Sequence, residues 1–518
     1  MIEATRQTSW LDPIKLFFHP RVIALFFLGI SAGIPLLLIF SSLSLWLREA
    51  GLDRAAVTYF SWAALGYSFK FVWAPLVDTL PLPFLTSRLG RRRGWLFLSQ
   101  VMVITAIIMM ALTDPAHISL GIMAAAAVFL GFSSATQDIV IDAYRIESAE
   151  DDLQALMSST YIAGYRTGMI ISGAGALLLA SYWGSTSANY NYDAWKWSYL
   201  TMAGIMSLGL LTTLIISEPS NALKKEGKEN HIGFLLLFIF SAMGFVASFY
   251  FSGSLFEEIK LNLAASLHNA KLASVIIETC RLSLGLAAAV IIAKVTISLG
   301  IVKSERIKNT YLAPINDFFQ RYGWSFALLL LALIGFYRIS DIVLGVIANV
   351  FYQDMGFTKT EIASVVKSFG LLMTIAGGFL GGLLAVRFGV IKILFLGALL
   401  SSLTNLLFML LAQSGHDMTL LYLVISADNL SSGLASAAFI AFLSSLTNIS
   451  FTAVQYAIFS SLMTLLPKIL GGYSGQLVET FSYSYFFLIT ALIGLPVLLL
   501  IVLADRKFKF NAVTIKAG

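Results

Sequence analysis

The chain has 518 residues, of which 34 are Lys or Arg and 28 are Asp or Glu, so that 12% are charged, against roughly 25% in a soluble domain. Hydrophobic residues make up 58% and the mean hydropathy is +0.84, which excludes a water-soluble fold and indicates a chain that crosses a lipid bilayer many times. The formal charge of +6 does not indicate nucleic acid binding, because no basic stretch is interleaved with aromatic residues.

Fourteen apolar spans follow one another along the chain. Each is continuously apolar over about 20 residues, which predicts membrane-spanning helices rather than the alternating strands of a barrel. Glu3 and Asp12, without a small-residue cleavage site nearby, predict that the first helix is retained. We expect helices at 22–46, 56–78, 95–113, 117–144, 154–181, 196–216, 232–252, 273–300, 324–348, 361–385, 390–412, 418–444, 450–470 and 482–504.

The spans carry a weak internal repeat. Leu47-Arg-Glu-Ala-Gly-Leu-Asp-Arg54 follows the first span, and Tyr352-Gln-Asp-Met-Gly-Phe-Thr-Lys359 follows the ninth, about 305 residues later. Six spans before and six after an extra pair predict a transporter with two parallel halves. The expected domains are an N-terminal six-helix bundle at 1–220, a linker with two inserted transmembrane helices at 221–323, and a C-terminal six-helix bundle at 324–518.

Several short polar motifs lie within or at the ends of these spans. They are Phe69-Lys-Phe-Val-Trp-Ala-Pro-Leu-Val-Asp78, Gly90-Arg-Arg-Arg-Gly-Trp95, Ser134-Ala-Thr-Gln-Asp-Ile-Val-Ile-Asp-Ala-Tyr144, Gly164-Tyr-Arg-Thr-Gly-Met169, Phe336-Tyr-Arg-Ile-Ser-Asp341, Asp428-Asn-Leu-Ser-Ser-Gly433 and Phe451-Thr-Ala-Val-Gln-Tyr-Ala457. In these motifs and their order the sequence resembles the AmpG muropeptide permeases of the major facilitator superfamily. It departs from them in the extra helix pair, in Arg338 where the family often has Lys, and in Ser431-Ser432 in place of two glycines.

The resemblance implies the major facilitator fold, here an all-α membrane protein with fourteen transmembrane helices. It also implies a function: proton-coupled import of GlcNAc-1,6-anhydro-muropeptides from periplasm to cytoplasm, for cell-wall recycling, across the inner membrane of a Gram-negative bacterium. Lys and Arg concentrate in the segments on the N-terminal side of the membrane, which predicts that both termini are cytoplasmic. As is general in the superfamily, we expect a monomer.

Ionisable residues inside the spans are the first candidates for function, because a charge at a helix centre costs about 2.5–3.5 kcal/mol on insertion scales. Asp138 and Asp142 are four residues apart and share one face of the fourth helix, with Arg145 further along that stripe. With Lys70 in the second span they are candidates for proton coupling, since a carboxylate can exchange a proton for an ion pair with lysine. The alternatives are a permanent Asp–Lys bridge and an Asp142–Arg145 pair that shapes the turn.

Arg166 falls in the middle of the fifth span, beside Tyr161 and Tyr165. A guanidinium group among tyrosines suits an anionic ligand that carries sugar or peptide hydroxyls. An intraprotein partner for Arg166, such as Asp138, is the alternative. Gln137, in the same motif as Asp138, is a further substrate-binding candidate.

The second half supplies a matching set of polar residues. Arg338 and Asp341 are three residues apart and are able to pair with each other. Asp428 and Asn429 lie near the middle of their span without a local cation, which predicts that they line a cavity rather than face lipid. Gln455 completes the candidates for substrate binding in this half.

Other site chemistries find little support in the sequence. The five histidines lie at helix ends or in loops, which argues against histidine as the proton carrier. The sequence contains neither a His/Cys/Glu metal cluster nor a nucleotide-binding loop, and we expect no cofactor. The run from Arg91 to Arg93 is interpreted as a solvated topology signal.

Three other functions remain open at this stage. One is a carrier on the same scaffold for another anionic solute such as an acyl-CoA, or a drug exporter. Another is an intramembrane enzyme, because Gln137-Asp138-x3-Asp142 is similar to acidic motifs that hold magnesium, although the second half has only Asp341 and Asp428, far apart in sequence. A signalling receptor is disfavoured because the sequence shows no long cytoplasmic domain.

Overall fold

The computed structural model describes residues 16–52, 67, 69–117, 120–148, 151–186, 189–219, 231–267, 270–358, 361–471 and 474–517. Within these ranges the chain forms helices, and the single β-bridge, between Thr186 and Asn189, is isolated. The predicted all-α class is confirmed. Helices are expected in lipid because every backbone N–H and C=O group must find its partner within the same segment.

Eleven helices in the described ranges are long and apolar enough to cross a membrane. Two shorter apolar helices, Ser283–Ser298 and Ile449–Thr464, coincide with two more of the predicted spans. The predicted span at 56–78 lies largely outside the described residues. The described helices therefore agree with the expectation of fourteen.

In the N-terminal half, residues 16–219, the described helices follow the predicted spans in order. Some spans are divided: the first is interrupted at Phe40, whose backbone angles are not helical, and the fifth contains five π-helical residues. The elements are α2 (Pro20–Ile39), α3 (Ser41–Glu49), η2 (Lys70–Val72), α6 (Ala74–Thr79), α7 (Leu85–Leu89), α8 (Arg91–Ala111), α9 (Leu120–Ser148), α10 (Asp151–Ile170), η3 (Ile171–Gly175), α11 (Ala176–Tyr182) and α12 (Tyr192–Ile215).

The C-terminal half, residues 318–517, begins in the last turns of α16 (Ala313–Tyr322). Its first span is broken, so that Arg338 lies between two helices. A π-helical segment, η5, precedes α20. The elements are α17 (Trp324–Phe336), α18 (Ile339–Asp354), η5 (Ile362–Phe369), α20 (Gly370–Phe388), α21 (Val390–Ser414), α22 (Met418–Leu446), η6 (Ile449–Phe451), α23 (Thr452–Gly471) and α24 (Ser474–Ala517).

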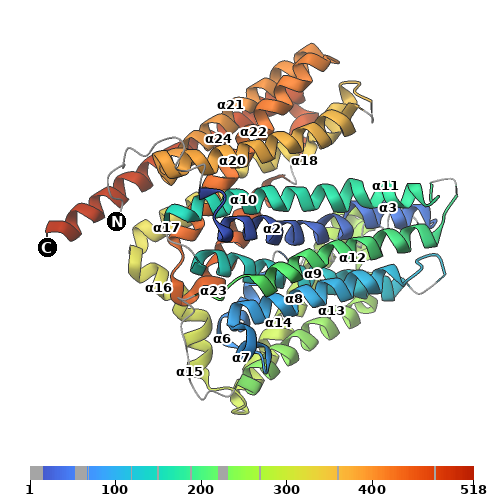
Figure 1. The fold of residues 1–518 in the computed structure, drawn as a ribbon. Coiled ribbons are helices and arrows are strands. Elements are labelled where there is room, and N and C mark those ends of the chain that lie inside the picture. Colours follow the sequence, from blue (N-terminus) through green and yellow to red (C-terminus); the bar gives the residue numbers. More distant parts are fainter. Residues whose placement is uncertain are drawn as a thin grey trace. The chain divides into compact units, whose positions relative to one another are not determined.

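The two halves have separate hydrophobic cores but form one compact unit. One core lies within residues 30–206, and the other is built almost wholly from residues 318–504. Contacts group Met1–Asp78, Leu82–Leu223 and Phe318–Gly518 into one unit, and Thr79–Pro81 with Lys224–Asp317 into another. Figure 1 shows α2 beside α10, and α20 beside α22, two of the most extensive helix pairs in the chain.

Glycines allow the helices of the larger unit to approach closely. A Cβ atom on Gly164 of α10 would overlap the carbonyl oxygen of Phe26 on α2. A Cβ atom on Gly382 of α20 would overlap the Ser159 side chain of α10, in the other half. Close packing at small residues is the usual means by which helices associate in lipid, where apolar burial provides no driving force.

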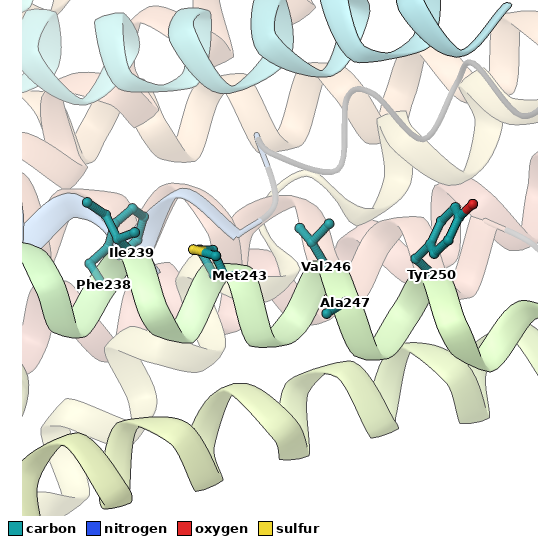
Figure 2. A pocket seen from close by; sticks show the side chains of 7 residues that line it. Phe238, Ile239, Met243, Val246, Ala247 and Tyr250 are labelled. Atoms are coloured by element: carbon teal, nitrogen blue, oxygen red, sulfur yellow. The ribbon is translucent and has the colours of Figure 1, made fainter.

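The smaller unit contains α13 (His231–Leu267), α14 (Ala270–Ser298), α15 (Ser304–Ile307), η4 (Lys308–Leu312) and the start of α16. Arg281 of α14 is bound within this helix pair, because it donates to the carbonyl oxygen of Phe249 at 2.8 Å and lies over the Phe249 ring at 4.5 Å. Figure 2 shows a shallow apolar hollow along one face of α13, lined by residues from Phe238 to Tyr250. It contains no charged side chain and lies outside the unit that holds the polar residues described next.

Candidate transport site

A buried charge cluster lies on α9. Asp138 and Asp142 share a face one turn apart, and the ammonium group of Lys70, on η2, lies 3.8 Å from Asp142. Arg145 approaches the other oxygen of Asp142 at 3.3 Å, so the predicted Asp142–Arg145 pair is present. Asp138 has no such pairing: its buried Oδ1 atom has no hydrogen-bond partner in the described part of the chain.

Arg145 also connects the two halves of the chain. Its side chain is fully buried and donates to Ser158 of α10 at 2.9 Å and to Ser444 of α22 at 2.6 Å. The ring of Tyr456, on α23, lies 5.2 Å from its guanidinium carbon. One cation therefore contacts a carboxylate of its own helix and two helices of the other half.

Arg166 on α10 is a half-buried cation with a different environment. Its one described hydrogen bond is a weak contact of 3.7 Å with the sulfur of Met169, and no carboxylate in the described ranges lies within ion-pair distance of it. The guanidinium of Arg338 is close enough for the two charges to repel each other. Tyr161 and Tyr165 lie on the same helix as Arg166, with their ring centroids 6.1 Å apart. Tyr165 also interacts electrostatically with Asp138.

Arg338 of the C-terminal half is partly satisfied by its own half. The predicted pair with Asp341 is present at 3.1 Å, and Ser436 of α22 accepts a hydrogen bond from Arg338 at 2.6 Å. Asp341 also accepts a short hydrogen bond from Ser401 of α21. Because α17 ends two residues before Arg338, the side chain extends from a break in the helix.

Asp428 and Asn429 lie next to each other on α22 but have different neighbours. Asp428 accepts a long hydrogen bond of 3.4 Å from Thr404. It also interacts electrostatically with Asp341 and Arg338. Asn429 accepts from Thr374 of α20 at 2.9 Å, which joins two helices of one half. Asp428 therefore belongs to the Arg338 cluster, whereas Asn429 is bound to a neighbouring helix.

The two glutamine candidates are bound by protein groups. Gln137 is fully buried and donates to Ser31 of α2 at 2.9 Å. Gln455 is also buried, and its Oε1 atom accepts from Arg321 at 3.1 Å and from the backbone N–H of Asn448 at 2.7 Å. Both amides thus join protein segments within one half.

A second charged network was not predicted from the sequence. Arg92, at the start of α8, is 1% exposed, so the interpretation of Arg91–Arg93 as a solvated run is wrong for this residue. It binds Asp78 at 2.6 Å and Glu147 through two hydrogen bonds of 2.9 and 2.5 Å. It also donates to Thr452 of α23 at 2.7 Å, in the other half.

Asp78 completes this connection between the halves. Its carboxylate accepts hydrogen bonds from the backbone N–H groups of Ala453, at 3.3 Å, and Val454, at 3.1 Å. The first N–H groups of a helix have no partner within it, and the helix dipole favours an anion there. We call Asp78, Arg92, Glu147 and Thr452 the latch. The sequence feature that could have predicted this network is the presence of Asp78, Arg92 and Glu147 near the ends of spans, where charges of opposite sign are able to pair instead of being solvated.

The larger unit therefore offers the parts of a transport site. A buried carboxylate with an unpaired oxygen is able to hold a proton, and a half-buried guanidinium without a carboxylate partner is able to bind an anion. The latch joins the halves through contacts that break if they separate. No group of three or more His, Cys, Asp or Glu side chains in the described ranges converges as metal ligands would.

Comparison with known proteins agrees with this description. The model of the Major Facilitator Superfamily matches residues 71–341. The chain is 31% identical over 493 residues to putative transporter AmpG 4 of Rickettsia conorii, covering 95% of this chain and 98% of the relative. It is 26% identical over 501 residues to the anhydromuropeptide permease of Escherichia coli K12, covering 96% of this chain and 83% of the relative.

Solved structures share the fold at low sequence identity. The proton:xylose symporter XylE, bound to 6-bromo-6-deoxy-D-glucose, superposes with a TM-score of 0.59 at 13% identity, covering 93% of this chain and 94% of that one. The human organic anion transporter MFSD10 superposes with a TM-score of 0.53 at 11% identity, covering 96% of this chain and 100% of that one. The chain is a membrane transporter of the Major Facilitator Superfamily and belongs, within it, to the AmpG-type transporters.

Proposed function

We propose that this protein is a proton-coupled importer of GlcNAc-1,6-anhydro-muropeptides. The observation that carries the proposal is Arg166, a half-buried cation without a carboxylate partner in the described residues, on the helix that carries Tyr161 and Tyr165. A muropeptide joins an uncharged disaccharide to a peptide with carboxylates. It therefore requires aromatic surface for the sugar and a cation for the acid, and this helix presents both.

The second half contributes to the same ligand. Arg338 keeps Asp341 as a counter-ion, but its charge still acts on Arg166. We assign the carboxylates of the peptide to this pair of guanidinium groups, because an anion between them removes their mutual repulsion. Planar guanidinium groups bind carboxylates through two parallel hydrogen bonds, which also fixes the orientation of the peptide.

Proton coupling is assigned to the cluster on α9. Asp138 holds the transported proton, because its unpaired Oδ1 atom has no other described donor. Lys70 and Arg145 hold Asp142 in its charged form through ion pairs of 3.8 and 3.3 Å. When Asp138 loses its proton it becomes a second anion beside Lys70, so the ion pairing of this lysine changes with the state of the carrier.

Direction and location follow from the same proposal. The latch joins the halves at the end of the bundle where α8 begins and α9 ends, and we assign this end to the cytoplasm. The carrier is then closed toward the cytoplasm and takes up its substrate from the periplasm. Both termini are cytoplasmic, the membrane is the bacterial inner membrane, and the protein acts as a monomer with two six-helix bundles and an inserted helix pair at 221–323.

Reconstituted vesicles test this function. Purified protein in liposomes with an inward proton gradient is expected to accumulate radiolabelled GlcNAc-anhydro-muropeptide, and collapse of the gradient with an ionophore is expected to stop accumulation. Free peptide and free anhydro-disaccharide serve as comparison solutes. Uptake of an acyl-CoA or a hydrophobic cation without uptake of the muropeptide would show that the substrate assignment is wrong.

A further inference from the structure

The turn between α22 and α23 is also bound by a residue of α16, outside the latch. Arg321 donates to the carbonyl oxygen of Leu446, the last residue of α22, at 3.1 Å. The last carbonyl groups of a helix have no donor within it, and a cation there also complements the helix dipole. Arg321 therefore acts as a C-terminal cap supplied by another segment of the chain.

The same arginine fixes the backbone beyond the helix end. Its second hydrogen bond, of 3.1 Å, goes to Oε1 of Gln455, which also accepts the backbone N–H of Asn448 at 2.7 Å. The Asn448 side chain in turn accepts from the N–H of Ser450 at 2.9 Å. Arg321 and Gln455 thus connect the end of α22, the turn, and the first turn of α23.

Aromatic contacts hold the end of α16 on the C-terminal half. Phe318 is 3% exposed, and its ring lies 5.2 Å from that of Phe459 on α23. Tyr322 packs edge-on against Phe326 of α17 and Phe508 of α24. Buried aromatic side chains combine large apolar area with defined geometry, so these contacts set the position of Arg321.

Residues of the N-terminal half bind the same turn through the latch. Thr452 and the N–H groups that follow it bind Arg92 and Asp78, and Ser444, two residues before Leu446, accepts from Arg145. The turn is therefore bound by two sets of contacts. Those to the N-terminal half break when the halves separate, whereas those to Arg321 lie within its own half.

We propose that α16 is a strap that holds the α22–α23 turn in the position required by the latch, with Arg321 as the positioning residue. In the chain, α16 follows the inserted helices, and its last residues, from Phe318 on, belong to the larger unit. The inference rests on the proposed function only in that opening of the latch is a step of the transport cycle.

A distance measurement that needs no substrate tests the strap. Cys280→Ser removes the only cysteine of the full chain, and spin labels are attached at Ser87→Cys and Arg506→Cys, exposed positions near the latch end of the two halves. Pulsed electron resonance then gives the latched and unlatched distance populations. Arg321→Gln is expected to lower the latched population at least twofold, and Arg321→Lys, which keeps a cation, by less. Lys392→Gln, an exposed cation on α21 of the same half, is the matched control and is expected to change nothing.

Uptake provides the second measurement. In vesicles Arg321→Gln is expected to change the maximal rate several-fold and to leave KM unchanged, because the residue does not touch the substrate site. A distance distribution for Arg321→Gln equal to that of Lys392→Gln overturns the proposal, whether or not muropeptide is the substrate. If Arg321→Gln fails to purify as a folded protein, Gln455→Met removes the shared acceptor at similar volume, with the same two outcomes.

Discussion

The ammonium group of Lys70 lies 3.8 Å from Asp142, while Asp138, one turn earlier on the same helix, keeps a buried oxygen without a described hydrogen-bond partner. The two carboxylates therefore differ in what they bind. Asp142 lies between two cations, whereas a charge on Asp138 would be buried without a hydrogen-bond partner for this oxygen, which is costly, so we expect Asp138 to be the carboxylate that takes up a proton.

Asp138→Asn tests this division. The amide keeps the size and hydrogen-bonding capacity of the side chain but cannot titrate, so proton-driven accumulation of the muropeptide is expected to disappear while exchange of labelled substrate persists. Both rates are measured in the same vesicles, with and without a proton gradient. Unchanged accumulation contradicts the assignment and makes Asp341 or Asp428 the next residue to test.

Arg166 is expected to bind the anionic part of the substrate. Arg166→Ala removes a charged hydrogen-bond donor, which is worth about 1.5–3 kcal/mol, so uptake at low substrate concentration should fall by roughly ten- to a hundred-fold. Arg166→Lys keeps the charge but loses the planar fork, so its uptake should fall less than that of Arg166→Ala. The measurement is the initial rate over a substrate series. An equal loss in both variants would mean that the planar fork is indispensable, and unchanged uptake by Arg166→Ala would contradict the assignment.

The latch is testable by a double-mutant cycle. Arg92→Gln leaves Asp78 and Glu147 buried without their shared cation, and breaking such a pair costs about 3–5 kcal/mol. Adding Glu147→Gln removes one of the two charges that have lost this cation, so the double variant should recover part of the loss. Thermal unfolding of the purified proteins gives the comparison. If the two losses simply add, the ion pair of 2.5 Å carries no coupling energy.

The sequence predicted those site contacts that are local along the chain. Asp142 and Arg145 are three residues apart on one helix, so helical geometry alone places them together. Arg338 lies just before α18 and only three residues from Asp341 in its first turn, so closeness along the chain places this pair together as well. The latch escaped prediction because Asp78 meets Val454 across 376 residues, and only the packing of the two halves brings them together. The fold was predictable because membrane spans are read from continuous apolar runs.

Gln455 shows the corresponding limit for polar residues inside the spans. A buried amide signals only that a partner must exist, not whether that partner is a ligand or the protein itself. The partners here are Arg321 and the backbone of Asn448. Arg321 comes from the end of an amphipathic helix outside every predicted span, so the apolar pattern gave no indication that it would reach this position.

A pH dependence of stability is expected at the loop that follows α8. Partial burial raises the pKa of Asp114, but hydrogen bonds from Tyr190 at 2.7 Å and His117 at 2.9 Å outweigh it, and the net pKa lies below the usual value. A carboxylate with a lowered pKa in the folded state adds stability above its unfolded pKa of about 3.9, and this is lost as pH falls through the folded value.

Asp114→Asn is the variant for this effect. It should lower the unfolding temperature of the protein at neutral pH, and the difference from wild type should shrink below pH of about 4. Melting curves in detergent across this range provide the measurement, and Asp193→Asn, an exposed carboxylate on α12, is the control. A difference that stays constant with pH means that the charge of Asp114 contributes nothing.

The last prediction concerns the inserted helices. Replacing residues 231–300 with a soluble linker should leave muropeptide uptake measurable, because α13 and α14 belong to the smaller unit while the transport site and the latch belong to the larger one. The replacement must keep α16, since Phe318 and Arg321 bind the C-terminal half. A second deletion that extends through Tyr322 removes this segment too, and it should lose uptake even when the protein reaches the membrane. Two outcomes contradict the argument: complete loss of uptake in the shorter deletion makes the inserted helices part of the carrier, and equal uptake in both deletions leaves α16 without a role.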